Sequence, residues 1–364
     1  MADPESRLAS TVLSRNLNLR RGENVLIESW PHSLPYARAF VREARRLGAR
    51  PTVLYEDDEA WWDAVKSGRL ASFSDLSKTE RAAMAAADVY IFFTGPEDRP
   101  RMNRLPGKVR ERLEGYNLEW YRLARKAGLR GCRMTLGQAT DAVAATIDMN
   151  GPRWRRRLVA AGSVDGRALL ARGQRVTRAI QPGKMLRIRH PNGTDLRIPL
   201  VGLHTRVDAG QVDAATRARP FGVLANNPSG QVLVAVDGGG ASGTFVSNRT
   251  VYLPPNRFGG TRWEFDQGRL IRYSCRIGGA LFRQQYRSAS EGRDRLSYFS
   301  IGLNPESRGL PPCEDTEEGA IILGIGGNAF AGGKARLPFQ GFAMIGQSTI
   351  EVDGRTLASG GRIR

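Results

Sequence analysis

Residues 24–55 read NVLIESWPHSLPYARAFVREARRLGARPTVLY. The run from Asn24 to Glu28 is short and apolar, which is typical of a buried strand in a parallel sheet. Residues 35–47 carry apolar side chains at helical spacing and stop at Gly48, where a glycine that ends a helix is expected. Pro51 to Tyr55 is a second apolar run. Strand, helix and strand within ~30 residues predict a βαβ unit.

The same alternation surrounds this unit. The sequence predicts helices at 7–17, 79–87 and 109–127 and buried strands at 88–94 and 131–136. Four strands with intervening helices predict a doubly wound α/β domain with a parallel sheet over residues 1–150. No Gly-x-Gly-x-x-Gly follows the first strand, so no dinucleotide is expected.

The second part of the chain has a different pattern. A helix is predicted at 150–162, and beyond it apolar residues alternate with polar ones, as in residues 185–189 (MLRIR) and 232–236 (VLVAV). Turns such as Pro191-Asn192-Gly193 separate these short runs. We therefore predict a β-rich α+β domain over residues 151–364.

The composition is that of a folded protein with an excess of positive charge. Of 364 residues, 41% are hydrophobic, and the formal net charge is +19. Only six of the 55 basic residues are lysine, and the arginines are spread along the chain, so the charge does not by itself indicate phosphate contacts. It favours an acidic partner, because a positive surface concentrates anions. Nucleic-acid binding is the third of three functional hypotheses.

Targeting signals and cysteine chemistry are not evident. No apolar run approaches the ~18 residues that span a membrane, and the first residues, MADPESRL, lack the basic and then apolar pattern of a secretion signal. We expect a soluble, cytoplasmic protein. Cys132, Cys275 and Cys313 are far apart, which argues against a disulfide framework and against a thiolate zinc site.

Several residues have both a structural and a functional interpretation. Trp61 and Trp62 follow the second strand, either as contact surface of a ligand crevice or as the packed start of a helix. His190 and His204 are expected to be ordinary satisfied or exposed histidines, because two histidines alone make a poor metal site. The acids at 314–318 (EDTEE) are expected to form a solvated surface.

A series of short motifs resembles the metallo-aminopeptidases typified by aminopeptidase T and aminopeptidase S. In chain order the motifs are residues 15–19 (RNLNL), 21–27 (RGENVLI), 87–89 (ADV), 193–196 (GTDL), 227–232 (NPSGQV), 242–244 (SGT), 301–305 (IGLNP), 324–326 (GIG) and 351–354 (EVDG). The resemblance implies an N-terminal α/β domain, a C-terminal domain with a two-metal site, and a homodimer. A related branch, the iron-dependent ring-opening dioxygenases, shares that fold.

The resemblance also implies positions for the metal ligands. The two glutamates of such enzymes correspond to Gln231 and Tyr298, and the histidine before the Gly-x-Gly turn corresponds to Ile322. The tyrosine after that turn corresponds to Ala329 or Phe330, and the final His-x-Asp pair to Pro338 and Gln340. Hydrolysis by two cations needs carboxylate and imidazole ligands, so we expect no metal, no other cofactor and no catalytic residues at these positions.

These replacements predict peptide recognition. An apolar groove is expected to bind a peptide through Gln231, Tyr298, Ile322, Phe330, Phe339, Gln340 and Phe342, with Arg283 and Arg287 holding acidic residues of that peptide. Alternatively, the same residues refill a lost cavity as core. The leading hypothesis is a non-catalytic, dimeric relative of the aminopeptidases that holds a peptide or protein substrate for a partner modifying enzyme, in the biosynthesis of a ribosomally made peptide. The alternative is an active hydrolase or iron-dependent dioxygenase with a relocated site.

Overall fold

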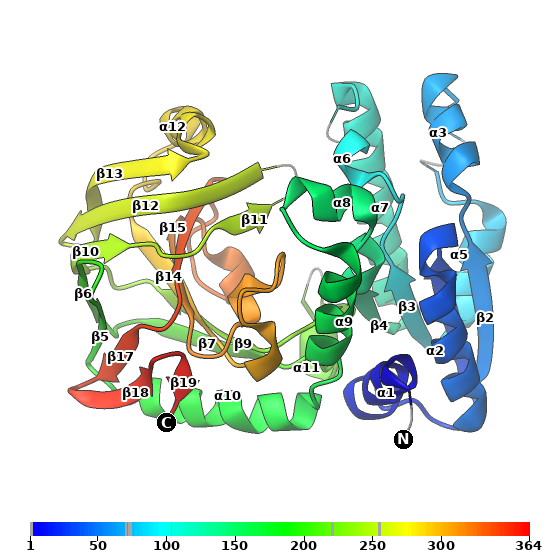
Figure 1. The fold of residues 1–364 in the computed structure, drawn as a ribbon, viewed down its shortest axis with the longest axis horizontal. Coiled ribbons are helices and arrows are strands. Elements are labelled where there is room, and N and C mark those ends of the chain that lie inside the picture. The colour runs from blue at the N-terminus through cyan, green and yellow to red at the C-terminus, as the bar shows by residue number, and fades with distance from the viewer. Residues whose placement is uncertain (1–2, 70, 72–74, 103, 220–221, 254–255) are drawn as a thin grey trace. The chain divides into compact units, whose positions relative to one another are not determined.

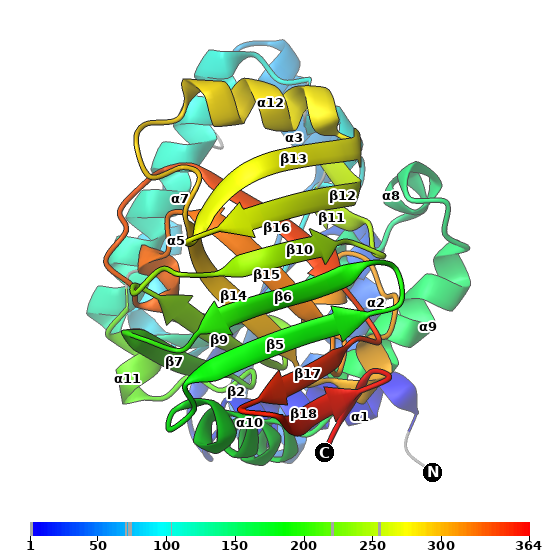
Figure 2. The ribbon, with the colours of Figure 1, turned by 90° about the vertical axis from the view of Figure 1, so that its left-hand side faces the viewer.

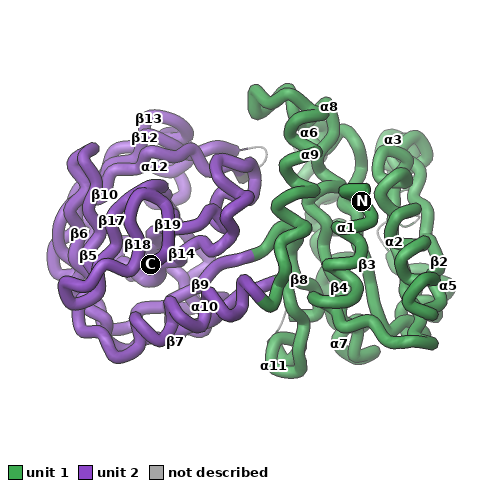
Figure 3. Tube along the Cα trace, turned by 60° about the horizontal axis from the view of Figure 1, so that its bottom comes forward, with its two compact units in different colours: residues 1–167, 210–229 green, residues 168–209, 230–364 purple. Residues whose placement is uncertain are grey.

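The computed structural model describes residues 3–69, 71, 75–102, 104–219, 222–253 and 256–364. Its internal contacts divide the chain into two compact units. Unit 1 comprises residues 1–167 and 210–229, and unit 2 comprises residues 168–209 and 230–364 (Figure 3). Each unit therefore contains two separate segments of the sequence.

Unit 1 is built on a five-stranded sheet in which all neighbouring strands are parallel (Figure 1). The order is β2 (Arg50–Tyr55), β1 (Asn24–Ser29), β3 (Val89–Phe93), β4 (Arg130–Met134) and β8 (Leu224–Asn227). Most residues of β1 and β3 are buried, as continuous apolar runs in a covered parallel sheet require. The strand order reverses between β1 and β3, where doubly wound sheets place ligand crevices.

Helices pack on both faces of this sheet. Trp120 of α7 and Met84 of α5 lie in one core cluster with Tyr90 of β3, whereas Phe40 of α2 packs against Phe93, with ring centroids 5.5 Å apart. The described helices of unit 1 are α1 (Pro4–Ser10), continued by a π-helix (Thr11–Asn16), α2 (Leu34–Arg46), α3 (Asp58–Lys66), α5 (Lys78–Ala86), α6 (Arg99–Met102), α7 (Gly107–Ala127), α8 (Asp141–Thr146), α9 (Gly151–Gly162) and α11 (Ala214–Arg217), with 3-10 turns at Pro31–Ser33 and Thr135–Gln138.

The doubly wound domain predicted from the sequence is confirmed, and its predicted helices and strands begin and end within a few residues of the observed ones. The local signals act as expected. Ser77 and Glu80 form a reciprocal capping box at the start of α5, and Gly128 ends α7 with a left-handed φ of 70°.

Unit 2 contains two sheets whose strand pairs are all antiparallel. The larger one, seen face-on in Figure 2, has the order β11 (Val251–Leu253), β12 (Asn256–Asp266), β10 (Ser242–Val246), β6 (Thr194–Pro199), β5 (Met185–His190), β17 (Thr349–Val352), β18 (Arg355–Ser359) and β19 (Arg362–Ile363), with β13 (Arg269–Ile277) paired to β12. The smaller sheet has the order β16 (Gln340–Ile345), β15 (Ile321–Gly326), β14 (Leu296–Gly302), β9 (Gln231–Val236) and β7 (Leu203–Asp208).

The burial of these strands follows their residue patterns. β6 alternates buried and exposed residues, as a sheet with one wet face requires, whereas every residue of β14 and β15 is buried. The remaining elements of this part of the chain are α10 (Gly166–Ile180), α12 (Gly279–Ser288) and 3-10 turns at Pro305–Ser307, Glu314–Thr316 and Ala329–Ala331. Among the described helices, none is long and apolar enough to cross a membrane.

The prediction that residues 314–318 form a solvated surface is wrong. Glu314 and Glu317 are only 3% and 2% exposed. Glu317 is held by Arg249, whose Nη2 lies 2.7 Å from its Oε1. Burying a carboxylate is tolerated when it is paired, and the partner lies far away in the sequence, so the charge pattern alone did not reveal it.

Candidate functional site

The residues singled out by the resemblance lie in or near the smaller sheet of unit 2. Tyr298 of β14 and Ile322 of β15 are 5% and 9% exposed and pack in one apolar cluster, with Phe342 of β16 against it. The ring of Phe330 lies 4.9 Å from that of Tyr298, nearly perpendicular to it, and Phe330 is 40% exposed. Gly324 allows this packing, because a Cβ atom there would overlap the Tyr298 ring. We call Tyr298, Ile322, Phe330 and Phe342 the Tyr298 cluster.

Phe339 belongs to a second aromatic group. Its ring centroid lies 6.2 Å from that of Phe282 and 5.9 Å from that of Tyr286, both on α12. Arg283 and Arg287, on the same helix, are exposed. The structure therefore places an aromatic surface beside two solvated guanidinium groups.

Gln231 and Gln340 have separate surroundings. Gln340, the first residue of β16, is exposed. Gln231 Nε2 donates to Asp315 Oδ2 at 3.2 Å. Burial, followed by the charge of Asp208, raises the pKa of Asp315 to about 6, and burial, followed by the charge of Asp315, raises the pKa of Tyr298. Asp315 is thus a carboxyl group that changes charge near neutral pH, which the sequence interpretation had placed on the surface.

The described residues of unit 2 do not bring three histidine, cysteine or carboxylate donors within ligand distance of one another. His190 Nδ1 accepts a hydrogen bond from the backbone N–H of Asn192 at 3.1 Å. The side chain of His204 is 47% exposed and its Nε2 lies 3.4 Å from Asp237 Oδ2. Both histidines have ordinary partners, as expected from the sequence.

Unit 1 contains a second candidate site, on the sheet face that α5 and α7 cover. Strand register places Glu28 of β1 beside Phe92 of β3, Phe92 beside Arg133 of β4, and Arg133 beside Asn226 of β8. Neighbouring strands are ~4.8 Å apart, so an acid and a base stand ~10 Å apart at their Cα atoms with an aromatic ring between them.

A cavity of about 690 Å³ lies over this row, within the size range of small-molecule sites. Aromatic side chains contribute to its wall, among them Trp30, Trp61, Phe92 and Tyr116. Trp61 and Trp62 are both buried, with Trp30, in a core cluster. Trp61 therefore agrees with both interpretations of this tryptophan pair, because it packs in the core and also lines the cavity.

Charges of opposite sign occupy different parts of this cavity. Tyr90 donates a hydrogen bond to Glu28, and burial, with the charges of Glu56 and Glu80, raises the pKa of Glu28 to about 8. Burial, followed by the charge of Arg133, lowers the pKa of Arg99 to about 10. Glu28 and Arg99 are thus each buried near groups of their own charge, and their hydrogen bonds are with Tyr90 and with the carbonyl oxygen of Gly95.

Three polar atoms on the wall of this cavity are buried without a hydrogen-bond partner among the described residues. They are Trp30 Nε1, Thr94 Oγ1 and Arg133 Nε. Trp30 and Thr94 are each only 5% exposed. An unpaired buried polar group costs ~1–3 kcal/mol, and three in one cavity indicate that a ligand or ordered water completes them.

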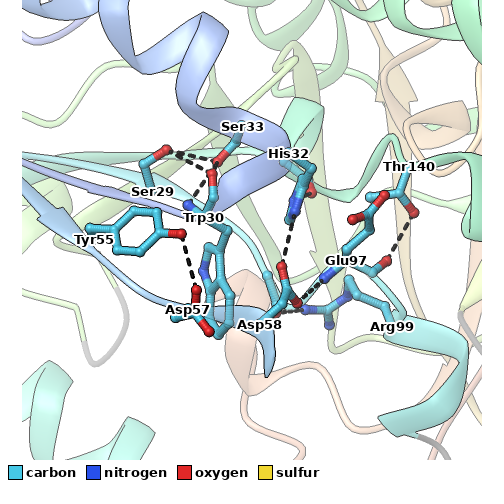
Figure 4. A network of polar contacts seen from close by, with 12 residues as sticks. Ser29, Trp30, His32, Ser33, Tyr55, Asp57, Asp58, Glu97, Arg99 and Thr140 are labelled. Carbon is cyan, nitrogen blue, oxygen red and sulfur yellow. Dashed lines mark hydrogen bonds and ion pairs between the residues drawn. The ribbon is translucent and has the colours of Figure 1, made fainter. Parts of the chain in front are cut away.

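A polar network lies at the carboxyl ends of the same strands (Figure 4). His32 follows β1, Asp58 begins α3 after β2, and Glu97 follows β3. His32 Nδ1 lies 3.7 Å from Asp58 Oδ2, and a donor atom from each of the three side chains lies within 4.8 Å of the others. The backbone N–H of Glu97 donates to Asp58 Oδ1 at 2.8 Å. These are the residues, among those described, that could hold a metal ion.

The sequence offers Trp61 and Trp62 as contact surface of a ligand crevice, but the row from Glu28 to Asn226 and the group of His32, Asp58 and Glu97 were missed. A usable signal existed, since polar residues follow the predicted strands ending at Glu28, Tyr55 and Thr94, and carboxyl ends of neighbouring parallel strands meet at one edge. Asn226 had no such signal, because β8 is short, polar and about 90 residues after β4 in the sequence.

Comparison with known proteins gives a fold and no close relative. No protein-family model matches the chain, and no curated protein matches it. Among solved structures, wild-type AmpT from Thermus thermophilus is similar with a TM-score of 0.70 at 20% sequence identity, over 99% of this chain and 98% of that one. A 2,5-dihydroxypyridine dioxygenase from Pseudomonas putida KT2440 is similar with a TM-score of 0.58 at 16% identity, over 100% of this chain and 98% of that one. The chain therefore has the mixed α/β fold of aminopeptidase T along essentially its whole length.

Proposed function

We propose that this protein is a non-catalytic, homodimeric peptide-binding protein on an aminopeptidase T fold, which holds a peptide for a partner modifying enzyme. The Tyr298 cluster carries the proposal. Positions that the resemblance assigns to metal ligands are occupied by the buried, mutually packed Tyr298 and Ile322 and by the half-exposed ring of Phe330.

The donor chemistry of these positions does not fit two divalent cations. Gln231 offers a neutral amide that is bonded to Asp315, and Ile322 offers no donor. Carboxylates that bridge cations and imidazoles that complete their shells are needed for hydrolysis by a metal pair. We therefore derive no hydrolytic step at this place.

Two groups of side chains in unit 2, the Tyr298 cluster and the aromatic group around Phe339, suit a peptide with apolar and acidic residues. Phe330 and the aromatic group around Phe339 present rings that can cover apolar side chains, and aromatic residues contribute strongly at protein interfaces. Arg283 and Arg287 stand exposed beside Phe339's partners on α12, and guanidinium groups bind carboxylates in a two-point fashion. Positive net charge of the chain speeds encounter with an acidic peptide.

Calorimetry with synthetic peptides tests this function. The probe is a synthetic peptide with alternating acidic and aromatic residues. A scrambled form and a form with lysine in place of the acidic residues are the comparison peptides. We expect saturable binding that Phe330→Ala weakens at least tenfold, because the exposed ring is lost. Ile271→Ala removes an apolar side chain that is 65% exposed on β13 and is the matched control. Equal binding by both variants, or no saturation with any peptide, contradicts the proposal.

The alternative, an active hydrolase or ring-opening dioxygenase with a relocated site, predicts turnover. Aminoacyl-nitroanilide and dihydroxypyridine substrates, each assayed with added Zn²⁺, Co²⁺ or Fe²⁺, distinguish it from peptide binding alone. Nucleic-acid binding predicts affinity for any duplex that falls steeply with salt. A gel-shift series over increasing salt tests that third hypothesis.

A second candidate function is favoured by the cavity of unit 1. We propose that it binds a small zwitterion, an amino acid or dipeptide with an aromatic side chain. Glu28 is two strands away from Arg133, and Glu56, Asp75 and Glu80 also line the cavity. We infer that these acids together suit an ammonium group and that Arg133 suits a carboxylate. The unpaired Trp30 Nε1 and Thr94 Oγ1 supply further hydrogen bonds.

Capped ligands separate the two charged ends. The probes are alanyl-phenylalanine, its N-acetyl form and its C-terminal amide, and the binding of each is measured by calorimetry. We expect the uncapped dipeptide to bind and each cap to weaken its affinity. In the Arg133→Met variant, the dipeptide and its C-terminal amide should bind with equal affinity, because the group that recognises the carboxylate is gone. Arg110→Met changes an exposed arginine of α7 and serves as control. Equal binding of all three probes contradicts the assignment.

A further inference from the structure

The loops that follow β1, β2 and β3 bring three potential metal ligands together in unit 1. These strands are neighbours in the order β2-β1-β3, so their carboxyl ends share one edge of the sheet. His32 lies in the 3-10 turn after β1, Asp58 is the first residue of α3, and Glu97 precedes α6. Figure 4 shows the imidazole of His32 above the carboxylate of Asp58, with Glu97 beside them.

The hydrogen bonds of His32 determine which ring nitrogen carries its proton. Nε2 lies 2.9 Å from the carbonyl oxygen of Gly137. Because a carbonyl oxygen only accepts, Nε2 must donate. In the neutral ring Nδ1 is then a bare lone pair. It faces Asp58 Oδ2, which also only accepts, at 3.7 Å. Two acceptors that face each other repel unless a hydrogen-bond donor or a cation lies between them.

Both of these atoms are shielded and unpaired. Neither His32 Nδ1 nor Asp58 Oδ2 has a hydrogen-bond partner within the described part of the chain, although both are buried. The side chains of His32 and Asp58 are 11% and 17% exposed. A buried carboxylate oxygen and a buried imidazole lone pair without partners are both unfavourable, and a bound cation would satisfy them together.

We propose that His32 Nδ1, Asp58 Oδ2 and a carboxylate oxygen of Glu97 bind one divalent cation, with Zn²⁺ the best match. Zinc is bound by imidazole nitrogen and carboxylate oxygen at ~2.0–2.2 Å, so tetrahedral ligands stand ~3.4 Å apart. The observed separation of 3.7 Å is close to this and too long for a direct hydrogen bond. One imidazole with two carboxylates also suits Mn²⁺ and Co²⁺.

Further contacts orient these ligands before a cation binds. The Nε2–H of His32 donates to Gly137, and Asp58 Oδ1 accepts from the backbone N–H of Glu97. Metal-bound histidines usually make such a hydrogen bond through their second nitrogen. Position 137 requires a glycine, because a Cβ atom there would overlap the backbone of Thr94.

The site has room for a fourth ligand. His32 and Glu97 both line a cavity of about 520 Å³, to which Arg42 and Arg155 also contribute. Three protein ligands and one open position are typical of zinc sites that bind water or a substrate. Asp3, Glu5 and Asp141 line the same cavity, and Arg155 is paired with Asp141 at 2.8 Å, so the expected fourth ligand is a water molecule.

Zinc titration of the full-length, tag-free protein after treatment with a chelator tests the proposal. We expect one saturable Zn²⁺ site per chain by calorimetry, and an absorption band of bound Co²⁺ in the visible range. His32→Gln and Asp58→Asn should each weaken Zn²⁺ binding more than the ~10–100-fold that loss of an outer hydrogen bond costs. His204→Gln removes the exposed histidine beside Asp237 and should leave zinc affinity unchanged.

Two outcomes contradict the proposal. If no saturable zinc binding is found at millimolar concentration, His32, Asp58 and Glu97 do not form a metal site. If zinc binds but His32→Gln and Asp58→Asn leave its affinity unchanged, the cation lies elsewhere. Should the His32 variant not fold, Glu97→Gln, at an exposed position, provides the same comparison.

Discussion

Arg249 and Glu317 form a two-point ion pair in unit 2. Nη2 of Arg249 lies 2.7 Å from Oε1 of Glu317 and Nε lies 3.2 Å from Oε2. The backbone N–H of Gly309 donates to the same Oε2 at 2.9 Å. Glu317 is 2% exposed, so these donors take the place of water around its carboxylate.

Removing the arginine leaves this charge buried and uncompensated. We expect Arg249→Ala to lower the free energy of unfolding by ~3–5 kcal/mol, measured by urea denaturation. Arg262→Ala, which breaks a pair with Glu264 in which Arg262 is 50% exposed, should cost ~1 kcal/mol or less. Similar losses for both variants would show that Glu317 is solvated after all.

Stability should fall as the pH rises from about 5 to 9. Burial raises the pKa of Glu314 from 4.5 to about 9 and that of Glu28 from 4.5 to about 8. Between the unfolded-state pKa of 4.5 and the raised folded-state pKa, the folded state binds more protons than the unfolded state. The stabilisation is therefore complete below pH 4.5 and is lost as the pH rises through the folded-state pKa.

Glu314→Gln removes one of these titrations. We expect the unfolding free energy of this variant to change less between pH 7 and 9 than that of the parent, measured by urea denaturation at several pH values. Glu291→Gln, at an exposed position, is the control and should keep the parent's slope. An unchanged slope in the Glu314 variant contradicts the buried carboxyl group.

Gly324 is required by the ring of Tyr298. A Cβ atom at Gly324 would overlap that ring, so Gly324→Ala should cost ~1–3 kcal/mol of stability through overpacking. At Gly115, in α7, a Cβ atom meets nothing within 4 Å, and Gly115→Ala should stabilise the protein by ~0.5–1 kcal/mol. Thermal melting should therefore give a lower melting temperature for Gly324→Ala and a higher one for Gly115→Ala than for the parent protein.

Asp353, in the Glu351–Gly354 motif, holds the start of β5. Its carboxylate accepts from the backbone N–H of Lys184 at 3.0 Å and of Met185 at 2.9 Å, and its φ is 48°. Asp353→Ala leaves these donors without that acceptor and places alanine in a left-handed conformation, at an expected cost of ~1–3 kcal/mol. Asp353→Asn keeps an acceptor and tolerates this φ, so it should lose much less on chemical denaturation.

The sequence alone predicted four of the five strands of the parallel sheet of unit 1, all but β8, and its longer helices. Apolar runs at residues 24–28 and 88–94, capping residues and glycines act over a few positions, so their effect is visible locally. The resemblance also brought together Tyr298, Ile322 and Phe342, which pack in one cluster. Phe339 lies instead with α12, because side-chain grouping depends on which elements face each other.

Only the tertiary structure decided the chemistry of both units. The burial of Glu317 depends on Arg249, 68 residues away, and the row from Glu28 to Asn226 depends on strand register in a sheet completed by β8. His32, Asp58 and Glu97 meet because three parallel strands end at one edge. Such convergence has no signature in a linear pattern, since folding brings together side chains whose neighbours in the sequence carry no common signal.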